Sequence, residues 1–523
     1  GGAYPLAREE MFRYLNEGVV WWCFAGHANN HAWTHDKQLT FTDLNEMYLT
    51  RLPYIYAATC DFLRWDSNTV SGDELLFFER YGGAVGMISA TRPVYITDNG
   101  FFSEAMGRAL ARRDDDGRLM AAGEIYRRAK NDIRNSRGEH RSNPNRLRYV
   151  FMGDPALRPV TPDNIVVLDS IDGKPVGTDN QVVIAARSIV EFTGHIESPD
   201  GTKLDGFNGT VGIDIYDADR SVTSNGNGDG KAITFEVHGD KLYSGSTTVT
   251  GGEFKITVAT PSEIADNFRE ATLNMYATSP DATAVGVCRD FYVYGLDEEA
   301  ADDDIAPVIE SLVINHPTFV SGDRVNADPM VIARISDNVG INLSTAGVGH
   351  QMTITLDGNR SYNDVPYYFT PSADGTASGE IAYPLSDLTD GPHTIMLRVW
   401  DTHTNSATKE IDFVVDSTIR PKIYDIYSDA NPASVRANFY LVHNRPNNLL
   451  TVTVSVYNLN GKLVWSDTSR GMSDMYLSSP VSWDLTDQSG ARVKRGIYVY
   501  RASISTDGDH YETDSRKIAV TAE

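Results

Sequence analysis

Residues 52–62 read LPYIYAATCDF, and the first part of the chain is organised around this stretch. The apolar run has no polar alternation and is entered through Pro53, which is typical of a strand buried on both faces of an α/β sheet. It leads directly into Cys60. In open α/β sheets the ligand crevice lies at the carboxyl ends of the strands. The sequence therefore predicts that the Cys60 thiol lies where such proteins carry out their chemistry.

A second run of the same form, residues 18–27, reads GVVWWCFAGH. We predict a buried strand that ends in His27, with Gly26 allowing a tight turn of the backbone. Two neighbouring strands would place His27 beside Cys60. A thiol nucleophile needs a histidine to take and return protons, and backbone N–H groups to hold the oxyanion. The pair therefore indicates cysteine-based catalysis, although a cysteine at the end of a buried strand is more often inert.

Composition limits the classes of protein that the chain can belong to. Its 523 residues are too many for one core and predict three to five domains. A formal net charge of −25 argues against a general nucleic-acid binder. The three cysteines, Cys23, Cys60 and Cys288, are far apart and lack metal-ligand spacing, so no zinc site, disulfide framework or cofactor is predicted. No apolar run approaches a membrane span of about 18 to 20 residues, and no signal peptide opens the sequence.

The first 160 residues or so alternate between helical and strand patterns, which indicates a parallel sheet with helices on both faces. Helices are expected at 6–16, from Thr42, at 71–83, 101–111 and 119–135, with strands at 18–24, 52–62 and 84–90. From about residue 164 short β-branched runs broken by Gly, Asn and Asp indicate β-sandwiches. Apparent linkers at 297–304 and 414–417 give the predicted domains: an α/β domain at 1–162 and β-sandwiches at 163–300, 305–416 and 419–523.

The motifs of the α/β domain resemble a known family. An apolar strand with Gly26-His27, followed by an apolar strand with Ala58-Thr59-Cys60, is the arrangement of the caspase-like cysteine peptidases, and the whole domain is similar to their C25, gingipain-type branch. Residues 151–158, FMGDPALR, resemble the phrase that ends gingipain-like catalytic domains. The chain departs from the family in having Ala28 after the histidine instead of glycine, and DFLRWD after the cysteine.

This resemblance implies a caspase-like catalytic domain in which Cys60 is the nucleophile and His27 the acid/base. The backbone N–H groups of Ala28 and Cys60 would be the oxyanion donors. The family's acidic residue that orients the histidine lies upstream of the histidine strand. The resemblance therefore implies that the catalytic domain is incomplete, and that a missing N-terminal part of the same protein completes its sheet.

The last sandwich has a resemblance of its own. Residues 454–464, the pair Trp483-Asp484 and residues 496–500 are similar to type IX sorting domains. Over all four domains the chain resembles the gingipain-like C-terminal signal peptidases, or sortases, of the type IX secretion system. The resemblance implies a cysteine peptidase and transpeptidase that removes the C-terminal signal domain of secreted cargo and attaches the cargo to anionic lipopolysaccharide. It also implies peripheral attachment to the bacterial outer membrane at the cell surface, through a PorV-like outer-membrane β-barrel partner.

Two other functions stay open at this stage. One is a secreted gingipain-like general endopeptidase, whose last sandwich would be a removable signal. The other is a non-catalytic surface adhesin built from sandwiches. Candidate walls of a substrate pocket are Trp33, Trp65 and Asp61, which are close in sequence to the dyad, although aromatic residues are more often core. Asp61 has two equal readings, pairing with a basic substrate residue or fixing the loop.

Overall fold

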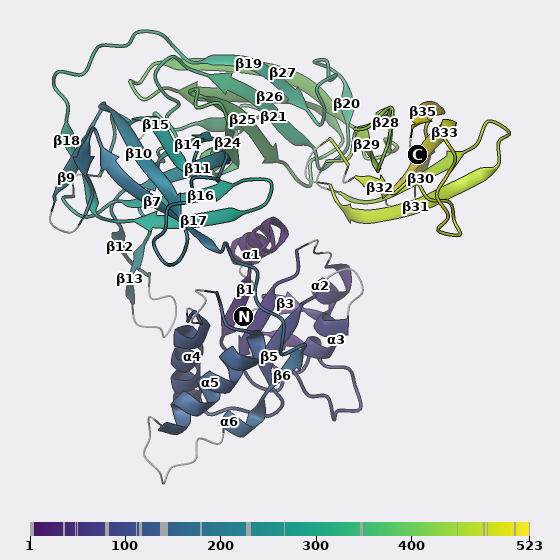
Figure 1. Cartoon of the computed structure of the whole chain (residues 1–523). Coiled ribbons are helices and arrows are strands. Elements are labelled where there is room, and N and C mark those ends of the chain that lie inside the picture. The colour runs from purple at the N-terminus through teal and green to yellow at the C-terminus, as the bar shows by residue number, and fades with distance from the viewer. Residues whose placement is uncertain are drawn as a thin grey trace. The chain divides into compact units, whose positions relative to one another are not determined.

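The computed structural model describes residues 5–34, 37–47, 49, 51–78, 83–110, 112–114, 118–135, 145–177, 180–225, 232–265, 267–345, 349–446, 448–473, 476–478, 480–506 and 509–521 (Figure 1). The chain forms two compact units, Gly1–Thr161 and Pro162–Glu523. In the described residues, no helix is long and apolar enough to cross a membrane.

The first unit is built on a four-stranded sheet in the order β1-β4-β5-β6. Its strands are β1 (Trp21–Ala25), β4 (Tyr54–Ala58), β5 (Gly86–Ala90) and β6 (Tyr149–Gly153), and a small hairpin adds β2 (Ala32–Trp33) and β3 (Leu39–Thr40). β1, β4 and β5 are parallel, as predicted, but β6 runs antiparallel to β5. The expectation of an all-parallel sheet is therefore wrong at this edge. At the other edge, β1 has no second neighbour among the described strands, and its Cys23 is exposed.

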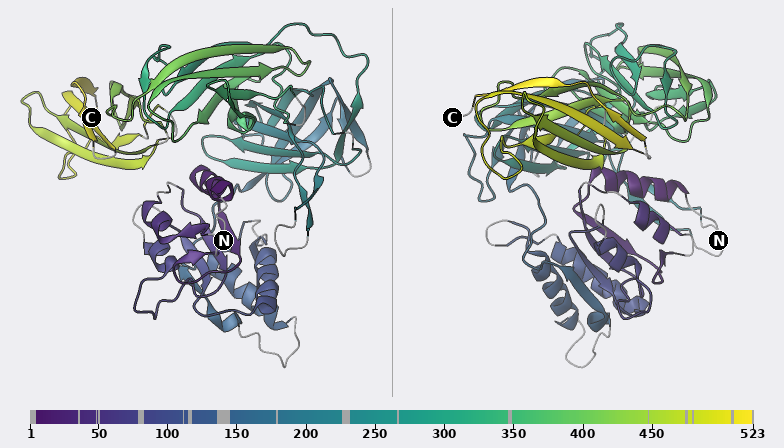
Figure 2. Two further views of the ribbon diagram at one scale, coloured as in Figure 1. Left: turned by 180° about the vertical axis from the view of Figure 1, so that it is seen from behind. Right: turned by 90° about the vertical axis from the view of Figure 1, so that its right-hand side faces the viewer.

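Helices cover both faces of this sheet (Figures 1 and 2). Side chains on the two faces alternate along β4 with the strand period of two: Ile55 and Ala57 belong to one core, and Tyr56 and Ala58 to the other. The first core is completed from α1 (Pro5–Glu17), α2 (Phe41–Glu46) and α3 (Gly72–Phe78), and the second from α4 (Ile96–Leu110) and α5 (Ala122–Asn135). A short α6 (Asn145–Arg148) leads into β6. Burial on both faces explains why β4 is an unbroken apolar run.

Element boundaries differ from the sequence expectations in two instructive places. The N-cap of α2 is Thr40, whose side chain accepts the Asp43 N–H in a capping box, so the helix begins before Thr42. The strand β4 ends at Ala58. Cys60 therefore lies in the loop just past the strand end, where its side chain is free of the sheet.

The second unit begins with a core enclosed by an eight-stranded sheet, in the order β14-β11-β16-β17-β7-β10-β15 with β8 on β7, and by the pair β18-β9. The strands are β7 (Asn164–Ile171), β8 (Lys174–Pro175), β9 (Val182–Ala186), β10 (Ile189–Glu197), β11 (Gly209–Tyr216), β12 (Arg220–Thr223), β13 (Thr234–Val237), β14 (Lys241–Val249), β15 (Glu253–Ala259), β16 (Thr272–Thr278), β17 (Thr283–Cys288) and β18 (Phe291–Leu296). Alternating burial along β10 and β11 is typical of sheets with one face on a core.

The next core lies between the sheets β19-β21-β25-β24 and β20-β27-β26-β22-β23. Its elements are β19 (Val308–Ile314), β20 (Arg324–Val325), β21 (Met330–Ser336), β22 (Thr353–Leu356), β23 (Arg360–Tyr362), the 3-10 helix η1 (Val365–Tyr368), β24 (Phe369–Pro371), β25 (Ser378–Pro384), β26 (Gly391–Trp400) and β27 (Ser406–Val415). Two facing sheets around one core make this part a β-sandwich.

The last core lies between the sheet β28-β29-β32 and the sheet β31-β30-β33-β34 with β35 on β33. The strands are β28 (Ile423–Ser428), β29 (Ala437–His443), β30 (Leu449–Tyr457), β31 (Leu463–Met472), β32 (Val481–Trp483), β33 (Gly496–Thr506), β34 (Asp509–Glu512) and β35 (Arg516–Val520). Each of the three cores falls within one of the ranges predicted from the sequence. That each range folds as a separate domain stays a prediction.

Candidate active site

The register of two parallel strands places the predicted dyad at one edge of the sheet. Ala25 of β1 pairs with Ala58 of β4, and the Gly26 N–H donates to the Ala58 carbonyl at 3.3 Å. His27 and Cys60 each follow these paired residues by two positions along parallel strands. His27 is exposed and Cys60 is half-buried. The two loops therefore begin side by side at the carboxyl edge of the sheet, and a joint role for His27 and Cys60 stays a prediction.

The Cys60 sulfur is held by the backbone of a third strand end. Val94, which follows β5, donates its N–H to Sγ at 3.3 Å, and the thiol lies 3.8 Å from the Val94 carbonyl oxygen. No hydrogen bond joins His27 to Cys60 among the contacts of the described residues. An N–H aimed at sulfur stabilises negative charge there, because hydrogen bonding to the charged form favours it. The thiol is thus placed next to a donor before any substrate is bound.

Both predicted oxyanion donors are available. Ala28 lies opposite Trp33 in a short antiparallel bridge. The hydrogen bonds of this bridge are made by the residues on either side of the pair, so the Ala28 N–H donates to no backbone group of the described residues. The Cys60 N–H has no acceptor within the described ranges either. An oxyanion hole requires N–H groups that are free to donate to the reacting oxygen.

The N-terminus of α3 ties the two loops of the site together. The Gly72 N–H donates to the Asn30 carbonyl at 2.9 Å, in the loop after His27. The Asp73 N–H donates to the Phe62 carbonyl at 3.1 Å, in the loop after the cysteine. A Cβ on Gly72 would lie 2.2 Å from the Phe62 ring, so only glycine allows this approach. The helix start therefore sets the separation of the two loops.

The side chain of Asp73 is wholly buried at this helix start. Neither of its carboxylate oxygens accepts a hydrogen bond of good geometry from the described residues. Burial raises the pKa of Asp73 to about 7, and the neighbouring Ser89 hydroxyl offsets part of that rise. A carboxyl group that titrates near neutral pH lies under the nucleophile loop, and sequence reasoning missed it because nothing in the sequence marks its burial.

Trp33 does not line a pocket, contrary to the expectation from the sequence. It is 1% exposed, stacks on Phe24 at 4.1 Å between ring centroids, and contacts Trp22 and Phe62 at 4.9 and 5.5 Å. Gly26 also has a role other than the tight turn predicted from the sequence, since a Cβ there would lie 2.7 Å from the Phe24 ring. The glycine makes room for the aromatic stack that supports the His27 loop.

The other two candidate pocket residues are accessible. Trp65 is 52% exposed in the loop after Cys60. Asp61 is half-buried and has a left-handed φ of 50°, which aspartate tolerates better than most residues, so it does help to shape the loop. An ion pair between Asp66 and Arg92 joins this loop to the one that carries the sulfur's donor. Contact of Trp65 or Asp61 with a substrate stays a prediction.

Asn99 on α4 is a further support that sequence reasoning missed. Its Nδ2 donates to the Ala58 carbonyl at 2.9 Å, and its Oδ1 accepts from the Tyr149 hydroxyl. The end of β4 is thereby fixed from the second face of the sheet. An asparagine inside a helix carries no sequence signal for this role, and the Val94 donor is a backbone group that any residue except proline provides.

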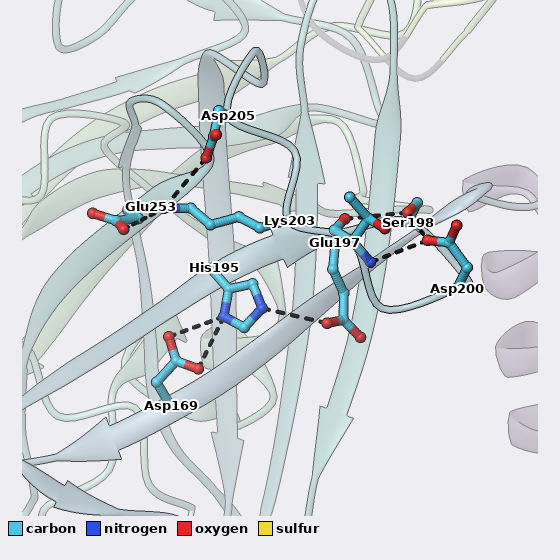
Figure 3. A network of polar contacts seen from close by, with 9 residues as sticks. Asp169, His195, Glu197, Ser198, Asp200, Lys203, Asp205 and Glu253 are labelled. Carbon is cyan, nitrogen blue, oxygen red and sulfur yellow. Dashed lines mark hydrogen bonds and ion pairs between the residues drawn. The ribbon is translucent and has the colours of Figure 1, made fainter.

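A separate polar network lies on the first sheet of the second unit (Figure 3). Nδ1 of His195 lies 2.9 and 3.0 Å from the Asp169 carboxylate oxygens, and Nε2 lies 3.4 Å from Glu197. Lys203 pairs with Glu253 close by. These are exposed or partly exposed polar contacts within and between neighbouring strands and loops, and contacts of this kind contribute little to stability. They offer no reactive centre comparable to Cys60.

Comparison with known proteins finds relatives of the first unit. Residues 1–160 match Peptidase family C25. The first unit thus has a gingipain-like, caspase-type fold, and the resemblance stated from the sequence is confirmed. Among solved structures, the chain is similar to latent PorU from Porphyromonas gingivalis, with 29% identity over 85% of this chain and a TM-score of 0.33. It spans 41% of that PorU chain.

A second solved structure, the RgpB pro- and mature domains from Porphyromonas gingivalis, shares 15% identity, with 56% of this chain and 57% of that chain covered and a TM-score of 0.27. No curated protein matches the chain.

Proposed function

We propose that the first unit is the catalytic part of a cysteine peptidase whose dyad is Cys60 and His27. The observation that carries the proposal is the register of β1 and β4, which sets both residues two positions beyond paired strand ends. The family match over residues 1–160 and the unused N–H groups of Ala28 and Cys60 support the same conclusion.

The proposed reaction follows from these groups. The Cys60 thiol gives its proton to His27, and the sulfur attacks the scissile carbonyl carbon. The N–H groups of Ala28 and Cys60 hold the oxyanion that forms. His27 then protonates the departing amine as the C–N bond breaks, which leaves a thioester. An incoming amine or water attacks the thioester, loses its proton to His27, and releases the thiol.

The finer proposal is that of a sorting-signal peptidase and transpeptidase at the bacterial cell surface. The substrates are the C-terminal signal domains of secreted cargo, and the acceptor amine belongs to an anionic lipopolysaccharide. Support comes from the last sandwich, where the stretches similar to type IX sorting domains fall on β30 and β33. We propose that this sandwich attaches the enzyme to a PorV-like outer-membrane partner.

The dyad is tested by labelling with a thiol-reactive peptide probe. We expect rapid labelling that Cys60→Ala abolishes, since the other two thiols are poor nucleophiles. Burial raises the pKa of Cys288, and the pKa of Cys23 is also raised by desolvation of its sulfur, although the residue is exposed. Cys23→Ala is the matched control and should leave labelling unchanged. Equal labelling of the Cys60→Ala variant would exclude the dyad and favour the adhesin.

The choice between sortase and general endopeptidase is tested with two substrates that share one junction. A folded cargo signal domain should be cut much faster than a short peptide of the same junction, because a sortase has to accept varied junctions and read the folded domain. If the enzyme is a sortase, the cargo released from its signal domain is joined covalently to the acceptor amine. A peptide cut as efficiently as the domain, and only after Arg or Lys, would support the general endopeptidase.

A further inference from the structure

Three aspartates from separate segments meet at one edge of the second sandwich. Asp303 belongs to the acidic segment before β19, Asp337 directly follows β21, and Asp401 directly follows β26. One carboxylate oxygen of each lies within 4.8 Å of those of the other two. Oxygen atoms that share one Ca²⁺ at about 2.3 to 2.6 Å are separated by no more than about twice that distance. The cluster therefore has the size that a single ion requires.

One oxygen of each outer carboxylate is already satisfied. Oδ1 of Asp337 accepts the N–H groups of Val339 and Gly340 at 2.8 and 2.7 Å, and Oδ1 of Asp303 accepts Nδ2 of Asn338 at 3.0 Å. The second oxygen, Oδ2, of both aspartates is buried from solvent and accepts no hydrogen bond from a described residue. A buried carboxylate oxygen without a partner is costly. Two of them side by side indicate that a ligand belongs between them.

The third carboxylate is the most enclosed. Asp401 has no exposed surface, and its oxygens accept from the N–H of His403 and from the N–H and Nδ2 of Asn405. No Lys or Arg of the described ranges forms an ion pair with any of the three aspartates, so no cationic side chain among these residues balances their negative charges.

We propose that Asp303, Asp337 and Asp401 bind one Ca²⁺ ion. Calcium takes six to eight oxygen ligands in flexible geometry, whereas zinc prefers nitrogen and sulfur and Mg²⁺ demands a strict octahedron. Three carboxylates supply the charge and part of the coordination shell, and backbone carbonyls or water complete it. The ion is the partner that Oδ2 of Asp303 and Oδ2 of Asp337 lack among the described residues.

The ion would fasten the acidic linker to the second sandwich. The same linker residue is held by Nδ2 of Asn405, which donates to the Asp303 carbonyl at 2.9 Å. Next to it, the Thr402 carbonyl accepts the N–H and the hydroxyl of Ser262, at 3.0 and 2.7 Å, from the segment after β15. Calcium therefore acts where the first and second cores of this unit are connected, and it makes the connection rigid.

The test is calorimetric titration of the full chain with CaCl₂ after removal of metal with EDTA, followed by thermal unfolding with and without about 5 mM Ca²⁺, a level that saturates extracellular sites with dissociation constants near 10⁻⁴ to 10⁻³ M. We expect saturable binding and a rise of several degrees in the unfolding temperature. Asp337→Asn should weaken binding at this site by about tenfold or more. In EDTA the same variant should be at least as stable as the wild type, because one of three like charges is gone.

Asp374→Asn is the matched control. Asp374 lies in the same sandwich and also accepts a backbone N–H, that of Thr376, but it is not part of the cluster. It should leave both Ca²⁺ binding and the unfolding temperature unchanged. If Asp337→Asn does not fold, the same measurements are made on Asp303→Asn, which changes the ligand in the acidic linker. Absence of Ca²⁺ binding to the wild type, unaltered binding by both cluster variants, or an equal response to Mg²⁺ would each overturn the calcium site.

Discussion

The backbone N–H of Val94 points at the sulfur of Cys60 from 3.3 Å away, so the nucleophile is held by a strand end that carries neither member of the dyad. The first prediction concerns this donor. Val94→Pro removes the N–H, and Val94→Ala keeps it. We expect alkylation of the protein by iodoacetamide at neutral pH to slow several-fold in Val94→Pro alone, because the thiolate loses its hydrogen bond. Equal rates in both variants would show that the donor does not influence the thiol.

A second prediction concerns the helix start that ties the two loops. Gly72→Ala places a Cβ 2.2 Å from the Phe62 ring, so the loop after Cys60 has to move. Overpacking of this kind costs about 1 to 3 kcal/mol, and the displaced loop should lower kcat/KM at least tenfold. Gly107→Ala is the control, since nothing lies within 4 Å of a Cβ there and the change favours helix α4 by about 1 kcal/mol. Unimpaired cleavage by Gly72→Ala would show that the start of α3 does not position the loops of the site.

The third prediction is a pH dependence of stability. The pKa of Asp73 is raised to about 7 by burial, above its ordinary value near 4. As the pH rises through this window the unfolded chain ionises first, so the free energy of unfolding should fall by a few kcal/mol between pH 4 and pH 7 and then level off. Asp73→Asn should remove this component. Urea unfolding at about pH 5 and pH 8 measures it, and a parallel fall in both proteins would assign the loss to other groups.

A fourth prediction separates attachment from catalysis. The core of the last sandwich is formed within residues 423–520, so a chain that ends at Ser417 should keep the first unit folded. In a bacterium with a type IX secretion system, this truncated enzyme should appear in the medium and still react with the thiol probe. If it stayed on the cells, another part of the protein would be the anchor.

Much of the first unit could be predicted because a strand buried on both faces consists of consecutive apolar residues. The runs at 18–27 and 52–62 indicated two neighbouring strands with His27 and Cys60 just beyond their ends, but of the two only β4 is buried throughout, and β1 is a partly exposed edge strand. Apolarity has no direction, however, so it did not reveal that β6 is antiparallel. Nor did it distinguish a core tryptophan such as Trp33 from an accessible one such as Trp65, because that difference depends on which rings stack in the folded unit.

Strand β1 has an outer edge that is unpaired within the described part of the chain, and such an edge tends to pair with another copy. Cys23 is exposed on this strand. Two copies joined antiparallel along β1 and centred on Cys23 would bring these thiols together. Because the pKa of Cys23 is raised, oxidation should be slow, but concentrated samples stored for days without reductant should accumulate a covalent dimer, visible on a non-reducing gel and absent in Cys23→Ser. Any further strand that paired with this edge of β1 would cover it and protect the protein from this oxidation.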